Sequence, residues 1–196
     1  MQTKKELLNT LESFPHFKVF SIKNIDPNAK LNLKKNFYKF AQKLGKIRLQ
    51  NYKKDKIIEI KPDLKKISQL KEENTKIKSV LRYHQTNLGG SIHSDGPQHT
   101  TPPKYIIMAC EQNSLSGGDT VLVDAKKIYK YLKIKKPEIL KILKKKILFE
   151  RRGFNFTNKN VFSKPIFEVK KNYFIFRYLR DYIEKGYEIK KKKIIK

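Results

Sequence analysis

The sequence has little of what would tie it to an oxidising compartment or to a membrane. It has one cysteine, Cys110, and no tryptophan among its 196 residues, so an internal disulfide is excluded. No apolar run approaches the roughly 20 residues of a membrane-spanning helix, and the first residues, MQTKKELLNTLESF, lack the apolar centre of a signal peptide. These absences predict a cytoplasmic protein. Because Cys110 ends the apolar run YIIMAC, we expect it to be a small buried hydrophobe rather than a nucleophile.

Acidic residues are scarce, since 18 Asp and Glu stand against 46 Lys and Arg and give a formal net charge of +28 at pH 7. Such an excess neutralises phosphate groups and would suit a nucleic acid. Only six of the 46 basic residues are arginine, the residue best suited to grip bases and phosphates, and the lysines are spread along the chain. We therefore expect no specific nucleic-acid site. A basic, non-enzymatic module that binds nucleic acid or an acidic partner remains the alternative function.

Apolar spacing predicts an α+β protein. Helical periodicity predicts helices over residues 4–14, 31–45, 125–133, 137–146 and 180–186, the second and last ending at glycines. Apolar or alternating segments predict strands over residues 16–22, 56–61, 78–84, 104–111, 119–124, 147–154, 164–170 and 172–179. Many strands with a few peripheral helices indicate a β-sandwich or barrel core, and the absence of repeats or Gly- and Pro-rich linkers indicates one domain.

One stretch, GGSIHSDGPQHTTPPKYIIMACEQNSLSGGDTVLVD, differs from the lysine-rich sequence around it. Its motif HSD places His93 and Asp95 two residues apart, and such residues project from the same face of an extended backbone. An imidazole nitrogen and a carboxylate oxygen can then reach one metal ion, next to a turn at Gly96. The spacing alone favours a plain surface pair, and only the surrounding sequence favours a metal site. A zinc hydrolase site that adds His99 is a further alternative.

Taken together, the pieces of this stretch resemble the taurine dioxygenase and clavaminate-synthase-like family of Fe(II)- and 2-oxoglutarate-dependent oxygenases. The matching pieces are His93-Ser94-Asp95-Gly96, Pro102-Pro103, the apolar run at 105–110, Gly117-Gly118-Asp119-Thr120 and Val123-Asp124. We also expect the glycine pair to form a tight connection with at least one positive φ.

The resemblance implies a double-stranded β-helix, or jelly-roll, core with peripheral helices and an Fe(II) site of two histidines and one carboxylate. His93 and Asp95 would be the first two iron ligands and the catalytic metal site. Thr120 would contact a carboxylate of the cosubstrate 2-oxoglutarate. The implied reaction is hydroxylation of a small-molecule substrate, coupled to decarboxylation of 2-oxoglutarate to succinate.

The sequence departs from the family pattern late in the chain. The family places its second iron-binding histidine and its cosubstrate-binding arginine after the region that corresponds to RYLRDYIEKG. Here the last histidine is His99, and Arg177 and Arg180 come too early to match that arginine. We therefore expect residues 1–196 to be a single, incomplete oxygenase domain that lacks its C-terminal part and has little activity as encoded.

The expected partners follow from the prediction of an incomplete oxygenase domain. We expect a small-molecule substrate, and either a second copy of the chain or a complementing C-terminal fragment to complete the fold. Neither a membrane nor a specific nucleic acid is expected.

Overall fold

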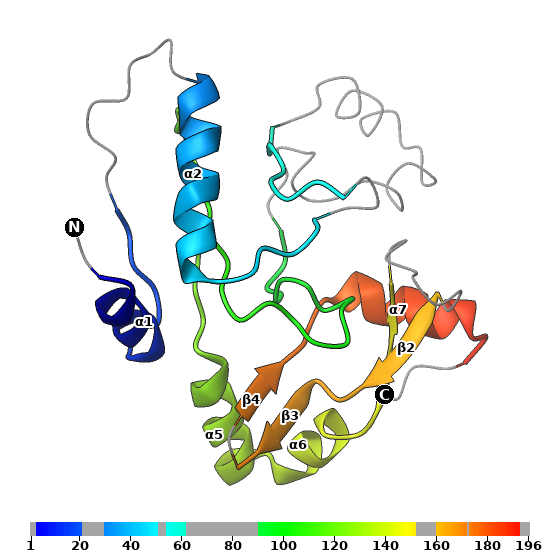
Figure 1. The fold of residues 1–196 in the computed structure, drawn as a ribbon. Coiled ribbons are helices and arrows are strands. Elements are labelled where there is room, and N and C mark those ends of the chain that lie inside the picture. The colour runs from blue at the N-terminus through cyan, green and yellow to red at the C-terminus, as the bar shows by residue number, and fades with distance from the viewer. Residues whose placement is uncertain are drawn as a thin grey trace. The chain divides into compact units, whose positions relative to one another are not determined.

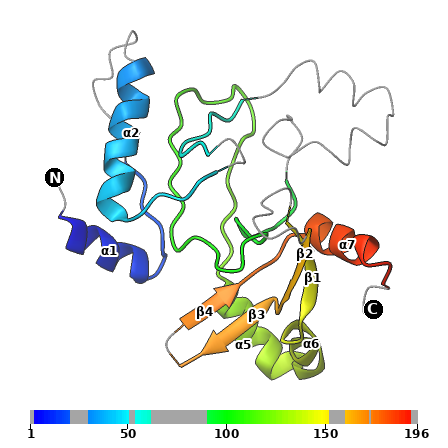
Figure 2. The same ribbon diagram turned by 45° about the vertical axis from the view of Figure 1, so that its right-hand side comes forward.

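The computed structural model describes residues 3–20, 30–50, 54–61, 90–151, 160–171 and 173–192. Figures 1 and 2 show the chain in two orientations. The helices in the described ranges are α1 (Lys4–Glu12), α2 (Lys30–Leu44), α5 (Ala125–Lys135), α6 (Pro137–Leu143) and α7 (Arg180–Ile189). The strands are β1 (Ile147–Glu150), β2 (Val161–Lys164), β3 (Phe167–Lys170) and β4 (Tyr173–Phe176).

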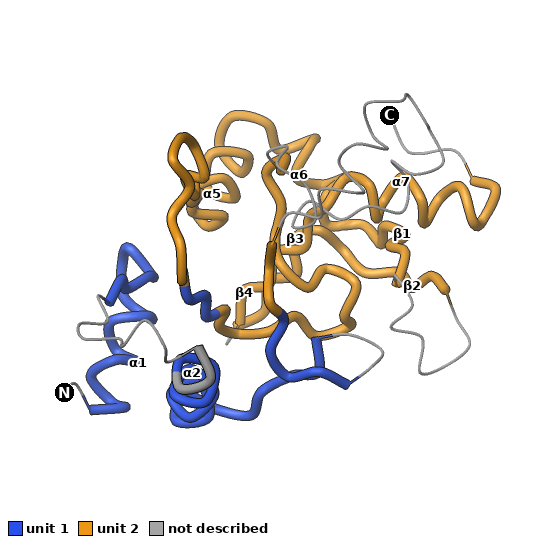
Figure 3. The backbone as a smooth tube through the Cα atoms, turned by 90° about the horizontal axis from the view of Figure 1, so that it is seen from above, with its two compact units in different colours: residues 1–58, 107–109 blue, residues 59–106, 110–196 orange. Residues whose placement is uncertain are grey.

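The chain divides into two compact units, which Figure 3 colours separately. The first comprises residues 1–58 with 107–109, and the second comprises residues 59–106 with 110–196. The prediction of one domain over the whole chain stays a prediction. None of the described helices has both the length and the apolar character needed to cross a membrane.

The first unit contains α1 and α2. Helix α1 begins with a capping box in which the Thr3 hydroxyl accepts a hydrogen bond from the Glu6 amide and the Glu6 carboxylate accepts one from the Thr3 amide. Helix α2 ends at Leu44, and the amide of the following Gly45 donates to the carbonyl of Ala41. Both helices were predicted from the apolar spacing, and both are confirmed.

The second unit is built around two antiparallel hairpins, β1 with β2 and β3 with β4. Phe149 and Phe162 are directly opposed across β1 and β2, and their rings stack with centroids 5.5 Å apart. Phe167 and Phe176 form the corresponding pair across β3 and β4 at 5.0 Å. Burying the fully enclosed Phe149 side chain contributes about 2–3 kcal/mol to folding.

Three helices complete the core of the second unit. Helix α5 starts at the N-cap Asp124, whose carboxylate accepts a hydrogen bond from the Lys126 amide, and its Tyr129 packs edge-on against Phe167. Helix α6 starts with a proline at its first turn, as predicted. The buried cluster consists of Leu140, Ile147, Phe149, Phe162, Ile166, Phe167, Ile183 and Tyr187.

Helix α7 contains the one glycine whose predicted role is wrong. Gly186 was expected to end the helix, but α7 continues through it to Ile189. A Cβ at Gly186 would lie 2.9 Å from the backbone carbonyl carbon of Leu148 on β1. The glycine therefore lets the helix approach the strand backbone closely, and it is not a stop signal.

Several predicted strands are wrong. The described residues of the expected strands at 16–22, 56–61, 104–111 and 119–124 are not strands, and the expected strand at 78–84 lies outside the described residues. Apolar side chains are exposed in all four of these segments, including Met108 at 71% and Leu122 at 63%. An apolar, β-branched sequence favours an extended chain, but a strand also needs a neighbour to complete its ladder of hydrogen bonds.

The predicted strands in the C-terminal third are confirmed over part of their length, as β1, β3 and β4, whereas β2 was not predicted as a strand of its own. The described residues thus combine helices with small antiparallel sheets, as an α+β fold requires. Their two sheets have two strands each, and these residues form no closed barrel. The jelly-roll core stays a prediction.

Candidate functional site

The His-Ser-Asp motif has the geometry that its spacing predicts. The Nε2 atom of His93 lies 3.7 Å from Oδ1 of Asp95, so both side chains project from the same side of the segment. The ring is one-third exposed (33%) and the carboxylate is 59% exposed. Solvent and small ligands can therefore reach both groups.

The orientation of the imidazole ring is set by a local contact. The Nδ1 atom of His93 lies 2.6 Å from the carbonyl oxygen of Ser91. A carbonyl oxygen can only accept a hydrogen bond, so Nδ1 must carry the hydrogen. In the neutral ring this leaves the lone pair on Nε2, the atom that faces Asp95, and this is the tautomer that binds a metal through Nε2.

Between the two candidate ligands, Ser94 connects the motif to a segment far along the chain. Its amide donates to the carbonyl of Tyr178 at 2.7 Å, and its hydroxyl oxygen accepts from the Tyr178 amide at 2.9 Å. Tyr178 lies in the short segment between β4 and α7. Ser94 is half-buried, and these bonds dock the motif on that segment.

Arg177 makes a second connection between the motif region and the core. This side chain is 1% exposed, and its Nη2 donates to the carbonyl of Thr100 at 2.8 Å while its Nη1 donates to Oε2 of Glu168 at 2.9 Å. Its Nε is buried and has no hydrogen-bond partner among the described residues. An arginine engaged in this way is not available to bind 2-oxoglutarate, in agreement with its early position in the sequence.

Glu168 supplies the counter-charge for Arg177. Burial alone would raise the pKa of Glu168, but hydrogen bonds from Tyr173 and Arg177, together with the positive charges of Arg177 and Lys164, outweigh burial and lower it. The Tyr173 hydroxyl donates to Oε1 at 2.9 Å. The carboxylate therefore stays ionised at neutral pH.

The turn after the motif requires its glycine. Gly96 has φ +68°, and a Cβ there would lie 2.7 Å from Cδ of Pro103 and 3.3 Å from Cδ2 of His99. The amide of His99 donates to the carbonyl of Gly96 at 3.1 Å and closes the turn. The Pro-Pro element of the family pattern thus packs directly against the end of the motif.

The zinc hydrolase alternative is wrong for this structure. It required His93, Asp95 and His99 to converge on one ion, but no three His, Cys, Asp or Glu side chains among the described residues are grouped so that they could hold a metal. The histidine and aspartate of the motif therefore stand as a pair in the part of the chain that the structure describes.

The glycine pair forms the tight connection that was predicted. Gly117 and Gly118 have φ +68° and +83°, and the Ser114 hydroxyl donates to the carbonyl of Gly117. Thr120 is exposed, as are all residues at 111–123. Within the described residues, no hydrogen bond joins Thr120 to either side chain of the His-Asp pair. Its role toward 2-oxoglutarate stays a prediction.

Cys110 departs from the expectation of burial. It is exposed, and its Sγ donates to Oδ1 of Asn113 at 3.0 Å. The apolar run that was expected to bury it is not a strand, so no facing layer covers it.

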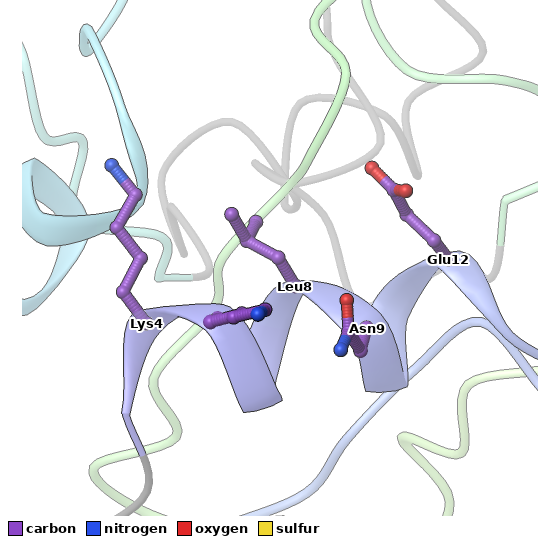
Figure 4. Close-up of a pocket in the computed structure, with 5 residues that line it drawn as sticks. Lys4, Leu8, Asn9 and Glu12 are labelled. Carbon is purple, nitrogen blue, oxygen red and sulfur yellow. The ribbon is translucent and has the colours of Figure 1, made fainter.

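Two surface hollows of the described residues lie elsewhere in the sequence. One is lined by residues 46–49, and another lies along α1, where Lys4, Leu8 and Glu12 project from the same side of the helix (Figure 4). Both belong to the first unit and contain none of the predicted site residues.

Sequence reasoning missed Ser94 and Arg177. The motif pattern identifies the two potential ligands but carries no information on what holds the backbone between them. The one available signal was position: in an extended segment, Ser94 has to face away from His93 and Asp95 and so toward the body of the protein.

An imidazole and a carboxylate lie two residues apart at the start of a glycine turn, and they are the residue types found in the 2-His-1-carboxylate class of iron site. The chain matches the sequence profile described as "Taurine catabolism dioxygenase TauD, TfdA family" over residues 16–187, and it belongs to this family. Family members use Fe(II) and 2-oxoglutarate. Comparisons with curated proteins and with solved structures gave no match.

Proposed function

We propose that the chain is an Fe(II)- and 2-oxoglutarate-dependent dioxygenase domain that hydroxylates a small molecule, with His93 and Asp95 as two of the iron ligands. The observation that carries this proposal is the 3.7 Å separation of His93 Nε2 and Asp95 Oδ1 on one side of a segment that Ser94 docks on Tyr178. The family match supports dioxygenase chemistry. The proposal includes a cytoplasmic location, which cell fractionation would test.

The donor set fits two positions of such a site. Two ligands at right angles and about 2.1 Å from one ion lie about 3.0 Å apart, so the two side chains need to approach by less than 1 Å. Both side chains are partly exposed, at 33% and 59%, so an ion can reach them from solvent. The described residues supply no third ligand. We propose that water, residues outside the described ranges, a second copy of the chain or a complementing C-terminal fragment supplies it.

The chain's own residues would bind and orient the iron and the 2-oxoglutarate. When bound, the iron and 2-oxoglutarate supply the oxidising chemistry. The hydrogen bond from His93 Nδ1 to Ser91 holds the ring with Nε2 toward the ion, and Asp95 adds a negative charge that favours a cation. Thr120 would donate its hydroxyl to a carboxylate of 2-oxoglutarate. In that case Thr120→Val should weaken 2-oxoglutarate binding and Thr120→Ser should not, and equal binding by both variants would remove Thr120 from the site.

Metal binding tests the central claim. We expect Fe(II), titrated anaerobically, to bind weakly and to lose this binding in His93→Ala and in Asp95→Asn, because two protein ligands cannot saturate the ion. His16→Ala is the matched control, since His16 is also exposed but lies in the first unit. Binding that His93→Ala leaves unchanged would refute the proposal.

The basic, non-enzymatic module remains the alternative function. No contact in the described residues favours it over the oxygenase, and the proposal includes no specific nucleic-acid partner and no membrane partner. Sequence-selective DNA or RNA binding that persists at about 0.15 M salt would favour the alternative, because nonspecific lysine contacts weaken steeply with salt.

A further inference from the structure

We infer that Ser94 and Arg177 are positioning residues for the metal pair: they hold the motif segment on the β4–α7 connection so that His93 and Asp95 project together. This inference rests on the proposed function, because it assigns a role toward the same ion. It adds two residues that touch neither the ion nor the cosubstrate and that the sequence motif does not identify.

The first anchor is Ser94. Its amide and its hydroxyl both engage the backbone of Tyr178, at 2.7 and 2.9 Å, so it is bound in two places to one residue. The immediate neighbours of a residue in an extended backbone project from the opposite face. Fixing Ser94 inward therefore fixes His93 and Asp95 outward, in agreement with the half-buried serine and the exposed pair.

The second anchor is Arg177, which acts beyond the turn that follows the motif. Its guanidinium bonds the Thr100 carbonyl on one side and Glu168 of β3 on the other. A lysine has a single point charge and could not reach both acceptors with the same geometry, whereas the planar fork of arginine does. The two anchored residues, Ser94 and Thr100, lie on either side of the Gly96 turn. The segment between them has no helix or strand of its own and is held at both ends.

Such anchoring matters because an unanchored segment would have to be ordered by the ion itself. Ordering a backbone segment costs conformational entropy, and a two-ligand site has little binding energy to offset that cost. A segment already held in the binding conformation avoids it. Outer contacts of metal ligands typically change metal affinity by about 10- to 100-fold.

Calorimetric titration with Zn²⁺, an ion that does not oxidise, tests the first anchor. We expect Ser94→Ala to weaken the His93-dependent binding by about 10-fold or more and Ser94→Thr, which keeps the hydroxyl, to restore it. Ser163→Ala, the same atomic change at a half-buried serine of β2, is the control. Wild-type affinity in a folded Ser94→Ala chain would overturn the inference.

Arg177 is tested in the same titration. We expect Arg177→Lys to weaken the His93-dependent binding, since one of its two acceptors must lose its partner. Arg180→Lys, at an exposed arginine of α7, is the control. Equal affinities for the two variants would remove Arg177 from the positioning role.

A second measurement uses the wild-type chain and so does not depend on whether a variant folds. Coupling between two sites is reciprocal, so an ion that binds better when the anchor is formed must also strengthen the anchor. We expect saturating Zn²⁺ to slow hydrogen exchange of the Tyr178 amide, and to leave the Leu7 amide of α1 in the first unit, bonded to Thr3, unchanged. If Zn²⁺ binds at His93 and the exchange rate of the Tyr178 amide does not change, the inference is refuted.

The outcomes separate the two claims. Zn²⁺ binding that His93→Ala does not weaken would contradict the proposed function and leave no pair to position. Binding that His93→Ala weakens, together with unaffected Ser94→Ala affinity and unaffected Tyr178 exchange, would leave the proposed function standing and refute only the positioning role.

Discussion

Arg177 and Glu168 form an ion pair in which Nη1 of the buried arginine donates to Oε2 of the half-buried glutamate at 2.9 Å. The side chains are 1% and 17% exposed, so little solvent screens the pair. Because the same guanidinium also bonds the carbonyl of Thr100, this pair links the stability of the second unit to the conformation of the motif loop.

Glu168→Gln should therefore destabilise the protein strongly. The substitution leaves a buried guanidinium without its counter-charge, which costs about 3 kcal/mol or more in free energy of unfolding. Urea denaturation followed by circular dichroism measures this difference. Glu184→Gln, which breaks the exposed pair with Arg180 on α7, is the control and should cost less than about 1 kcal/mol. Equal losses of unfolding free energy in the two variants would show that the ion pair with Arg177 stabilises the protein no more than an exposed pair does.

The contribution of Glu168 to the free energy of unfolding should also depend on pH, and it should fall as the solution is acidified. Its pKa is lowered in the folded state, so its contribution is complete above the unfolded pKa of about 4.3 and is lost as pH falls through the lowered value. The stability difference between wild type and Glu168→Gln should accordingly shrink as the solution is acidified below about pH 4. Urea unfolding at a series of pH values measures it, and a difference that grows on acidification would contradict the sign.

Gly186→Ala should destabilise the protein although alanine is the better helix former. Helix propensity favours alanine by about 1 kcal/mol in a helix interior, but the added Cβ would lie 2.9 Å from backbone atoms of β1, which cannot move aside. We expect a net loss of about 1–3 kcal/mol in thermal or urea unfolding. At Gly45 a Cβ would meet nothing within 4 Å, so Gly45→Ala is the matched control and should be close to neutral.

The chain as given should produce little succinate from 2-oxoglutarate with Fe(II) and ascorbate. The described residues provide only the His-Asp pair for the ion, and no histidine follows His99 in the sequence. Adding in trans a segment with a histidine and an arginine in the family's spacing should raise succinate formation, and His93→Ala should then abolish it.

His99→Ala distinguishes this expectation from a site completed within the motif loop. We expect the variant to leave any turnover unchanged, because His99 does not join the pair in a metal-holding group. Robust turnover by the chain alone that is lost in both His93→Ala and His99→Ala would instead show that His99 completes the triad.

Local features of the site were predictable because their causes are local. Residues two apart in an extended backbone share a face, so the spacing of His93 and Asp95 predicted that their side chains project together, although it did not predict a metal site. The positive φ values of Gly117 and Gly118 follow in the same way from a glycine pair placed at a turn.

Features that depend on a distant partner were not predictable from any pattern. The expected strand that contains Met108 has a suitable sequence, but a strand forms only where a neighbour completes its hydrogen bonds, and the sequence does not specify that neighbour. The same holds for Gly186, whose role depends on how closely β1 approaches the helix rather than on its place in the helical pattern.

The sequence by itself determined the family, the two candidate ligands and the helices with regular apolar spacing, because each depends on residue types at short separations. The tertiary structure alone decided what holds the ligands in place. Ser94 and Tyr178 are 84 positions apart, and they meet through backbone and hydroxyl groups that any sequence could offer. Only the packing of the β3–β4 hairpin brings Tyr178 and Arg177 to the motif, since hydrogen bonds of this kind depend on position in space and not on residue pattern.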